Sequence, residues 1–185
     1  MSGLKIVCIG SSAGGLVPTI EFFKQLAPNT GMAFVVIQHL QADAPSLTPV
    51  LLSRITPMTV TVADDQELAV PDHVYTMKPN VQLTIADGRF QVAPRTETAV
   101  RHKPFDRFLN SLAVDCGARA TAVVLSGYDG DGSLGFIAIK ARGGITYAQD
   151  RSAEVDEMPL HAMETGCVDH VLSPGQIADR ISQGR

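Results

Sequence analysis

Residues 4–15 have the sequence LKIVCIGSSAGG, a short apolar run that leads into a loop of small residues. The run Leu4–Ile9 has the length of a strand, and its mostly apolar residues predict burial on both faces. Gly10 ends the run, and the pattern of an amphipathic helix follows at Leu16–Leu26. A strand, a glycine-rich loop and a helix in this order are typical of the first unit of a parallel α/β sheet.

The same alternation continues along the chain. Further strands are expected at Ala33–Gln38, Thr59–Ala63, Ala120–Ser126, Ile145–Gln149 and Val168–Leu172. Further helices are expected at Pro45–Arg54, Phe105–Cys116, Ser133–Arg142, near Leu160–Thr165 and from Gly175 onward. Buried strands that alternate with helices predict an α/β fold of the three-layer, doubly wound type, with a mostly parallel sheet covered on both faces.

The segment Asp64–Arg101 breaks this alternation. His73–Met77, Gln82–Ala86 and Phe90–Ala93 have the pattern of strands in a small meander. Asp87-Gly88 lies between the last two and is a strong hairpin signal. We therefore expect an antiparallel hairpin excursion from the main sheet in this segment.

Composition sets the remaining limits. The chain has 185 residues, 45% of them hydrophobic, which suits one compact domain with a packed core. Its net charge is −4 and no Lys/Arg cluster marks a phosphate-binding face, so nucleic acid is not an expected partner. No run approaches the roughly 20 apolar residues of a membrane span, so the protein is not expected to be membrane-embedded. The cysteines are odd in number and widely spaced, which argues against a disulfide framework.

Two functions compete for the loop Gly10–Gly15. A dinucleotide-binding loop requires G-x-G-x-x-G and an acidic residue about 20 residues further on for a ribose hydroxyl. Ser12 stands at the middle glycine position and His39 at the place of the acidic residue, which argues against that function. The loop also fits G-x-S-x-G, which favours a nucleophilic serine on a tight turn near backbone N–H groups. Ser11 is a rival nucleophile, and helix capping is the structural alternative for Ser12.

Two further loops follow apolar strands and are therefore expected on the same carboxyl edge of the sheet. His39 comes directly after Ala33–Gln38, and GYDGDG at 127–132 follows the most apolar strand of the chain. A serine, a histidine and an aspartate on three strand ends fit a catalytic triad, which is defined by geometry and not by chain order. The order Ser12, His39, Asp131 differs from that of the α/β-hydrolases, which argues against that particular fold.

A calcium loop is the obvious alternative for the aspartates at 129 and 131. Such a loop requires glycine at its sixth position and glutamate at its twelfth, where this chain has Leu134 and Lys140. Asp131 has a second structural alternative as the cap of the helix Ser133–Arg142, and that role is compatible with catalysis. Among the histidines outside these loops, His73, His161 and His170 have no ligand spacing. No metal and no cofactor is therefore expected.

The three loops together resemble the catalytic domain of the CheB chemotaxis methylesterases. The resemblance rests on IGSSAGG at 9–15, Gln38-His39 and GYDGDG at 127–132, and it includes His102-Lys103-Pro104-Phe105-Asp106, which is similar to the family's H-R-P-x-x-D stretch, and Met158-Pro159 before a late helix. The resemblance implies that Ser12 is the nucleophile, His39 the base and Asp131 the residue that orients the histidine. It also implies that Ala13, Tyr128 and Met158 lie near the oxyanion and the substrate.

The activity implied by the resemblance is hydrolysis of glutamyl γ-methyl esters on methyl-accepting chemotaxis receptors, with deamidation of receptor glutamines by the same route. Two departures from the family pattern bear on the fit of the substrate. Tyr128 stands where Met is frequent, and Leu160 stands where Arg commonly follows Met-Pro. The alternative is a non-catalytic module of the same fold that binds receptors or a signalling partner. All three triad residue types are present, which argues against that alternative.

The familiar members of the family carry a receiver domain before the catalytic domain. In this sequence the first expected strand begins directly after Met1-Ser2-Gly3. We therefore expect a single methylesterase catalytic domain over residues 1–185, with no receiver domain, and a cytoplasmic location.

Overall fold

The computed structural model describes residues 3–39, 46–96 and 102–184. Its main sheet has seven strands in the order β3-β4-β2-β1-β7-β8-β9, and every neighbouring pair is parallel. The strands are β1 (Lys5–Ser11), β2 (Met32–Gln38), β3 (Thr59–Val62), β4 (His73–Thr76), β7 (Ala120–Val124), β8 (Ile145–Gln149) and β9 (His170–Leu172). A separate antiparallel pair consists of β5 (Val81–Ala86) and β6 (Arg89–Pro94).

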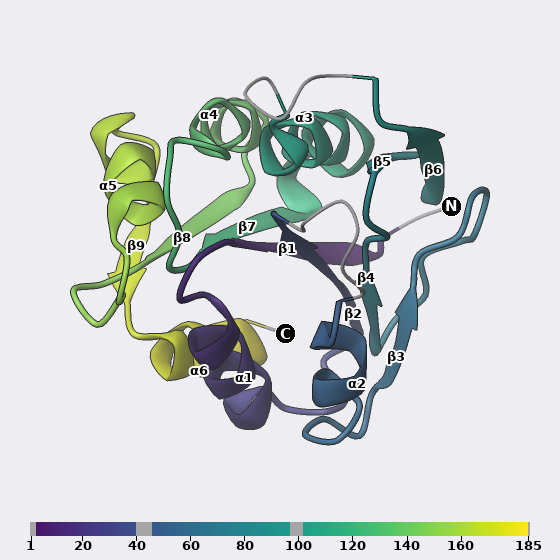
Figure 1. The fold of residues 1–185 in the computed structure, drawn as a ribbon, viewed down its shortest axis with the longest axis horizontal. Coiled ribbons are helices and arrows are strands. Elements are labelled where there is room, and N and C mark those ends of the chain that lie inside the picture. The colour runs from purple at the N-terminus through teal and green to yellow at the C-terminus, as the bar shows by residue number, and fades with distance from the viewer. Residues whose placement is uncertain (1–2, 40–45, 97–101, 185) are drawn as a thin grey trace.

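Helices cover both faces of the main sheet. They are α1 (Leu16–Gln25), α2 (Thr48–Leu52), α3 (Pro104–Cys116), α4 (Ser133–Ala141), α5 (Glu157–Glu164) and α6 (Pro174–Gln183), with a short 3₁₀ helix at Gly117–Arg119. Figure 1 shows α3 and α4 on one side of the sheet and α1, α2 and α6 on the other. This arrangement confirms the three-layer, doubly wound α/β fold. None of the helices in the described ranges is long and apolar enough to cross a membrane.

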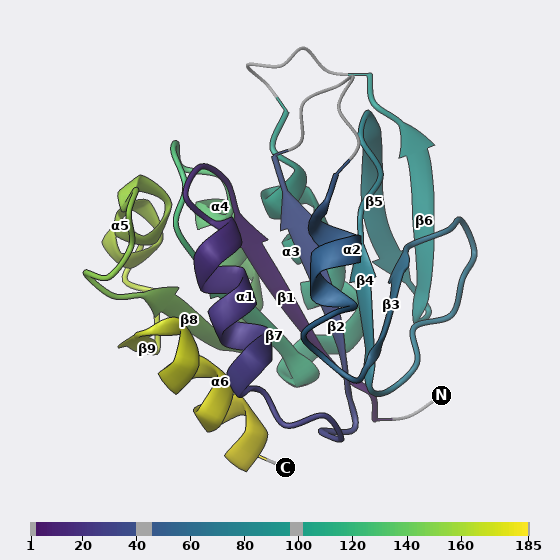
Figure 2. The same ribbon diagram turned by 60° about the horizontal axis from the view of Figure 1, so that its bottom comes forward.

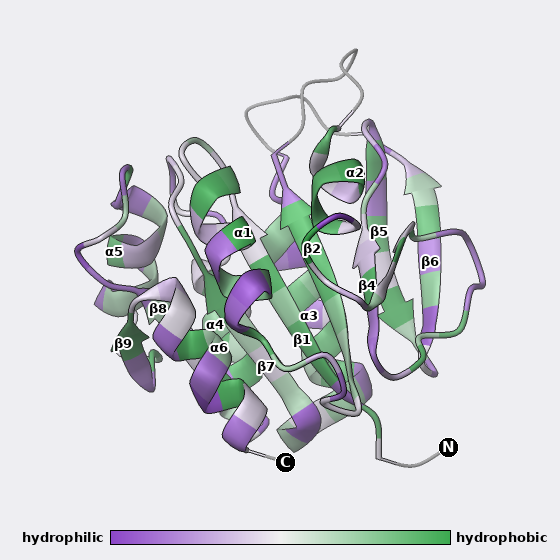
Figure 3. Ribbon diagram, turned by 90° about the horizontal axis from the view of Figure 1, so that it is seen from below, coloured by the Kyte–Doolittle hydropathy of each residue, from purple (hydrophilic) through white to green (hydrophobic). Residues whose placement is uncertain are grey.

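The two faces of β1 explain why the apolar run is continuous. Side chains alternate across a strand, so Ile6 and Cys8 join the core beneath α3 and α4, whereas Val7 and Ile9 join the core beneath α1 and α6. All four side chains are buried. Figure 3 shows the central strands coloured mainly as hydrophobic and the hydrophilic residues gathered on the outer helices and loops. A strand with both faces covered has apolar residues at consecutive positions, and the alternation of apolar and polar residues disappears.

The expected meander is wrong in one of its strands. β4 lies inside the main sheet, where Val74 pairs with Phe34 of β2 and with Val60 of β3. Only β5 and β6 are antiparallel, and the turn between them has positive φ at Asp87 and Gly88, as the hairpin signal predicts. Figure 2 shows this hairpin standing beside the sheet edge formed by β3 and β4. A short strand between two parallel neighbours has the same local pattern as a hairpin strand, so its sequence does not distinguish the two.

The expected helix at Pro45–Arg54 is shorter in the structure. The helix α2 covers only Thr48–Leu52, and Pro49 occupies its first turn. Pro45 lies outside the described residues. Proline favours the first turn of a helix because it lacks the N–H that would remain unpaired there.

The order of the strands determines where loops gather. β1 is central, the next strand along the chain lies on one side of it, and β7 lies on the other side. The strand order therefore reverses at β1, and the loops after β1, β2 and β7 leave from the same carboxyl edge. Ligands of doubly wound sheets bind in the crevice at such a switch point.

Candidate active site

A cleft of about 370 Å³ opens at the carboxyl ends of β1 and β2. Ser12 and His39 both line it, so the fold brings together two of the predicted catalytic residues. The rest of its wall consists of the start of α1, the start of α2 and one acidic side chain; the residues are Gly14, Gly15, Leu16, Val17, Gln38, Ser46, Leu47, Thr48 and Glu154. The third predicted residue, Asp131, lies beneath the surface behind His39.

His39 and Asp131 form a close pair. The distance from His39 Nε2 to Asp131 Oδ2 is 2.7 Å, and the Asp131 side chain is completely buried. The carboxylate also accepts hydrogen bonds from the backbone N–H groups of Phe105 (3.0 Å) and Asp106 (2.9 Å), in the first turn of α3. A helix N-terminus carries a partial positive charge, which stabilises a buried carboxylate. His39, Phe105 and Asp106 thus all approach this carboxylate with a donor or with the positive end of a helix dipole.

Asp131 does not cap α4 as the sequence allowed. The residue before α4 is Gly132, with φ of 101°, and the carboxylate that accepts from the first turn of that helix is Asp106, whose Oδ1 lies 2.8 Å from the Gly135 N–H. Asp131 instead binds the start of α3, which is distant in the sequence. The motif His102–Asp106 therefore supplies the backbone of the helix start that holds Asp131, and its Lys103 side chain pairs with Asp129 of the same loop.

The histidine tautomer follows from this geometry. A carboxylate only accepts hydrogen bonds, so neutral His39 carries its proton on Nε2 and keeps a lone pair on Nδ1. Nδ1 lies 4.0 Å from an oxygen of Asp129. That carboxylate pairs with Lys103 at 2.9 Å. Partial burial acts to raise the pKa of Asp129, but the Lys103 ammonium, the backbone N–H of Asp131 and the charge of His39 together hold this pKa below its usual value.

The two serines of the loop occupy different environments. Ser11 ends β1, is 1% exposed, and its hydroxyl accepts a hydrogen bond from Gln38 Nε2 at 3.3 Å. Gln38 is held in turn by the Thr48 hydroxyl at 2.6 Å. Ser12 is half-buried and lines the cleft. Within the described part of the chain, its hydroxyl has no hydrogen-bond partner. This difference favours Ser12 over Ser11 as the nucleophile.

Glycines of both motifs allow a close approach around one aromatic ring. A Cβ atom at Gly10 or at Gly132 would lie 2.3 Å from the ring of Phe105. A Cβ at Gly127 would lie 2.2 Å from Met158 Sδ and 2.9 Å from Ser12 Cβ. The glycines of these two loops, Gly10 in one and Gly127 and Gly132 in the other, therefore permit tight packing around Phe105 and Ser12. Sequence reasoning missed this role of Phe105, and the spacing of the glycines was its only signal.

The residues expected near the oxyanion are Ala13, Tyr128 and Met158. Ala13 follows the serine, and its carbonyl accepts a hydrogen bond from Ser126 at 2.9 Å. Tyr128 is 57% exposed at the rim, whereas Met158 is buried against Gly127. The backbone N–H groups of Ala13 and Tyr128 have no acceptor among the described residues. Both are therefore donors left unpaired by the described residues, on the loops that carry Ser12 and Asp131.

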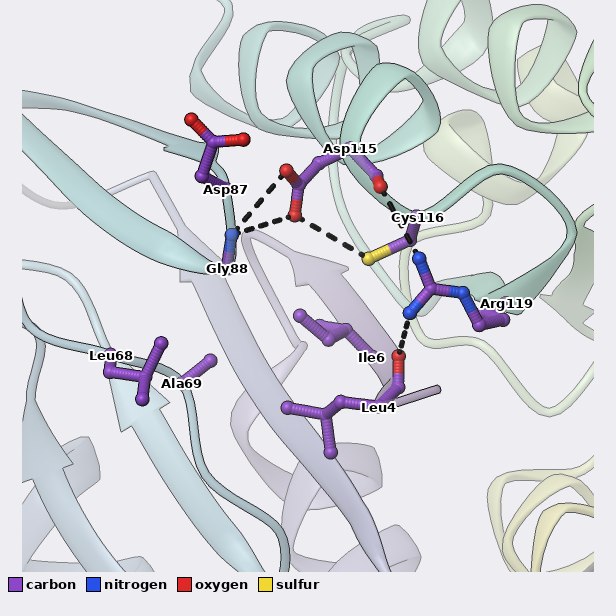
Figure 4. A pocket seen from close by; sticks show the side chains of 9 residues that line it. All are labelled: Leu4, Ile6, Leu68, Ala69, Asp87, Gly88, Asp115, Cys116 and Arg119. Carbon is purple, nitrogen blue, oxygen red and sulfur yellow. Dashed lines mark hydrogen bonds between the residues drawn. The ribbon is translucent and has the colours of Figure 1, made fainter. Parts of the chain in front are cut away.

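A larger cavity of about 460 Å³ lies at the opposite, amino-terminal edge of the sheet (Figure 4). Its polar groups bond to the protein itself. Asp115 accepts from the Gly88 N–H, and Arg119 donates to the Leu4 carbonyl at 3.1 Å. Burial raises the pKa of the Cys116 thiol to about 11, which keeps it protonated. Within the described ranges, no three histidine, cysteine or acidic side chains are grouped so as to hold a metal ion.

Fold and site together define a doubly wound α/β domain of the enzyme type, in which a histidine of the cleft is paired with a buried carboxylate where the strand order reverses. The profile of the family described as CheB methylesterase matches residues 7–181. The chain therefore belongs to the CheB methylesterase family. The crystal structure of the Thermotoga maritima CheB methylesterase catalytic domain is similar over 100% of both chains, with a TM-score of 0.91 and 27% sequence identity.

Several curated proteins are similar in sequence. The protein-glutamate methylesterase/protein-glutamine glutaminase 2 of Shewanella oneidensis is 31% identical over 184 residues, which cover 97% of this chain and 52% of that protein. The corresponding Bordetella parapertussis protein is 32% identical, with coverage of 97% and 53%. An uncharacterized 104.1 kDa protein of Rhodobacter capsulatus is 41% identical over 134 residues, 71% of this chain and 14% of that protein. The chain thus spans about half the length of the two named methylesterases.

Proposed function

We propose that this chain is a serine-type protein-glutamate methylesterase that hydrolyses glutamyl γ-methyl esters on chemotaxis receptors. The proposal includes one catalytic domain over residues 1–185 that acts in the cytoplasm. Family membership and the names of the relatives support the reaction. The observation that carries the proposed mechanism is the 2.7 Å contact between His39 and the buried Asp131, beside a cleft that also holds Ser12.

The first half of the reaction forms an acyl-enzyme. His39 takes the proton of the Ser12 hydroxyl on Nδ1 while the serine oxygen attacks the ester carbonyl carbon. The imidazolium keeps its Nε2–H on Asp131, which stabilises the positive charge. The tetrahedral intermediate then collapses, the bond to the methoxy oxygen breaks, and Nδ1 returns the proton so that methanol leaves.

The second half repeats the sequence with water. His39 takes a proton from water, whose oxygen attacks the acyl carbonyl. The bond to the Ser12 oxygen then breaks, Nδ1 returns the proton to that oxygen, and the glutamate carboxylate is released. A glutamine side chain follows the same route with ammonia as the leaving group. The glutaminase part of the relatives' names supports this second reaction.

The backbone N–H groups of Ala13 and Tyr128 serve as oxyanion donors in this proposal. Neither has an acceptor among the described residues. Ala13 follows Ser12, which lines the cleft, and Tyr128 follows Gly127, which packs closely against Ser12. Removing one such donor costs about 3–4 kcal/mol of transition-state stabilisation in serine hydrolases. The start of α1 lies directly behind the serine and adds a positive dipole end to the same region.

Methanol release from methylated receptor membranes tests the proposal. The purified chain should release methanol, and a fluorophosphonate probe should label Ser12 as mapped by mass spectrometry. Receptor binding without methanol release would contradict the esterase and indicate the non-catalytic module instead. Labelling at Ser11 would contradict the assignment of the nucleophile.

A further inference from the structure

Ser126 is the point where three loops of the site are joined. The strand β7 ends at Val124, and Ser126 is the second residue after it; its side chain is completely buried. Its carbonyl accepts from the Ser12 N–H at 2.9 Å, and its hydroxyl donates to the Ala13 carbonyl at 2.9 Å. Two of its four polar contacts therefore hold the backbone of the loop that carries the nucleophile.

The other two contacts of Ser126 reach the loop after β8. Its hydroxyl accepts from the Val155 N–H at 2.9 Å, and its own N–H donates to Gln149 Oε1 at 2.9 Å. Gln149 is 3% exposed, and its Nε2 donates to the Ser152 hydroxyl at 3.2 Å. Between Ser152 and Val155 lies Glu154, which lines the cleft beside Ser12. One buried network thus connects the nucleophile loop to a wall of the cleft.

The surrounding chain is shaped for this hydroxyl. A Cβ atom at Gly14, where φ is +70°, would lie 2.7 Å from Ser126 Oγ, so a side chain at that position would displace the contact. A hydroxyl both donates and accepts, and both functions are used here. An alanine at position 126 would leave the Ala13 carbonyl and the Val155 N–H without their partner.

We infer that Ser126 and Gln149 are positioning residues for the reaction. They touch no reacting atom; they fix the backbone of Ser12 and Ala13, and with it the nucleophile and one oxyanion donor. The inference rests on the proposed role of Ser12. A nucleophile displaced by about 1 Å loses roughly a hundredfold in rate, so a loosened loop acts on kcat and leaves substrate binding nearly intact.

Kinetics of methanol release by three variants of the full chain test this inference. Ser126→Ala should lower kcat by about tenfold to a hundredfold with KM within about threefold. Ser126→Thr keeps a hydroxyl and should restore kcat to within roughly threefold. Gln149→Met removes the acceptor of the Ser126 N–H and should lower kcat in the same way as Ser126→Ala. If Ser126→Ala does not fold, the kcat of Gln149→Met alone tests the positioning role.

The matched control is Thr146→Val. Thr146 is also fully buried, its hydroxyl donates to the Cys167 carbonyl at 2.6 Å, and it lies in the first half of β8. Removal of the Thr146 hydroxyl should lower the melting temperature and leave kcat unchanged. A loss of kcat in this control equal to that of Ser126→Ala would overturn the inference, because any buried hydroxyl would then have the same effect.

The rate of fluorophosphonate labelling at Ser12 separates the two proposals. Slower labelling in Ser126→Ala and Gln149→Met, matching their loss of kcat, supports the positioning role. Unchanged labelling and unchanged kcat in both variants would overturn that role and leave the esterase standing. A wild-type chain that neither labels at Ser12 nor releases methanol would overturn the esterase itself, and the positioning role with it.

Discussion

Two of the hollows in this domain lie at opposite edges of one sheet, and they differ in what their polar groups do. The amino-edge cavity has a volume of about 460 Å³ and the carboxyl-edge cleft about 370 Å³. In the larger hollow, Asp115 and Arg119 bond to backbone groups of the protein and the Cys116 thiol stays protonated. In the smaller one, a serine without a partner among the described residues shares the wall with a histidine held by a buried carboxylate.

The direction of the helices explains the difference. In a parallel α/β fold every helix that follows a strand begins at the carboxyl edge and ends at the amino edge, so the two edges carry opposite dipole ends. The start of α3 donates two N–H groups to the Asp131 carboxylate. Near the other end of the same helix, the Arg119 guanidinium donates to carbonyls, including that of Asp115. The proposed reaction is therefore placed at the smaller hollow because of the polarity of its edge, and not because of its volume.

The largest expected effect comes from the serine of the cleft. Ser12→Ala should reduce methanol release to the background level, because no other group supplies the attacking oxygen, while the melting temperature stays near that of the wild type. Ser11→Ala is the matched control, since Ser11 is buried on Gln38, and it should retain substantial activity. Activity that survives in Ser12→Ala would contradict the assignment of Ser12 as the nucleophile, and the cleft would no longer be distinguished from the amino-edge cavity by its chemistry.

The next effect concerns the two aspartates near His39. Asp131→Asn should lower kcat by up to about 10⁴-fold, because the amide can donate to His39 and stabilise the wrong tautomer. Asp129→Asn should cost far less, since Asp129 is half-exposed and 4.0 Å from Nδ1. Steady-state methanol release by the two variants decides this. Equal losses would mean that the conformation of the loop, and not the carboxylate of Asp131, controls the rate.

A third prediction concerns stability beneath the carboxyl edge. Burial, with the nearby Asp131 charge, raises the pKa of Asp106 to about 6 from its ordinary value near 3.8. The folded state therefore binds the proton more tightly, so this group stabilises the fold at low pH and loses that contribution as pH rises from about 4 to 6. Asp106→Asn removes the buried charge and should raise the free energy of unfolding at pH 7 by about 1–3 kcal/mol.

Denaturant unfolding of both proteins between pH 4 and pH 8 measures this difference. The variant minus wild-type curve isolates Asp106 from other carboxylates, such as Asp129 and Asp169, whose pKa values are lowered and whose contributions have the opposite sign. The difference should be small near pH 4 and reach its full value above pH 6. A difference that is constant with pH would show that Asp106 does not titrate in this range.

The smallest effect on activity is expected at the amino-edge cavity. Asp115→Asn weakens the contact with the Gly88 N–H and should cost about 1 kcal/mol of stability. The rate of methanol release should stay within about twofold of the wild type, because this side chain acts on the hairpin and not on the cleft. A tenfold loss of activity at an unchanged melting temperature would contradict this prediction, since it would mean that the larger cavity takes part in the reaction.

Local sequence determined most of the secondary structure and the convergence of the loops. Ile145–Gln149 is a strand with the predicted bounds, and α3 ends at Cys116 as predicted and begins at Pro104, one residue before the predicted start. The pair Asp87-Gly88 forms the predicted hairpin turn. These features depend on side-chain periodicity and on backbone preferences of single residues. The placement of Ser12, His39 and Asp131 near one edge follows from strands that are parallel, which the alternation of strands and helices already implied.

Only the tertiary structure decided which partner each group has. It placed β4 between two parallel strands, buried Ser11 on Gln38, and turned Asp131 toward the start of α3 in place of α4. It also gave His39 its tautomer and assembled the contacts of Ser126. The physical reason is common to all of these features. Periodicity reports which face of an element is buried, whereas a hydrogen bond or a buried charge depends on an atom supplied by a distant part of the chain, which no local pattern specifies.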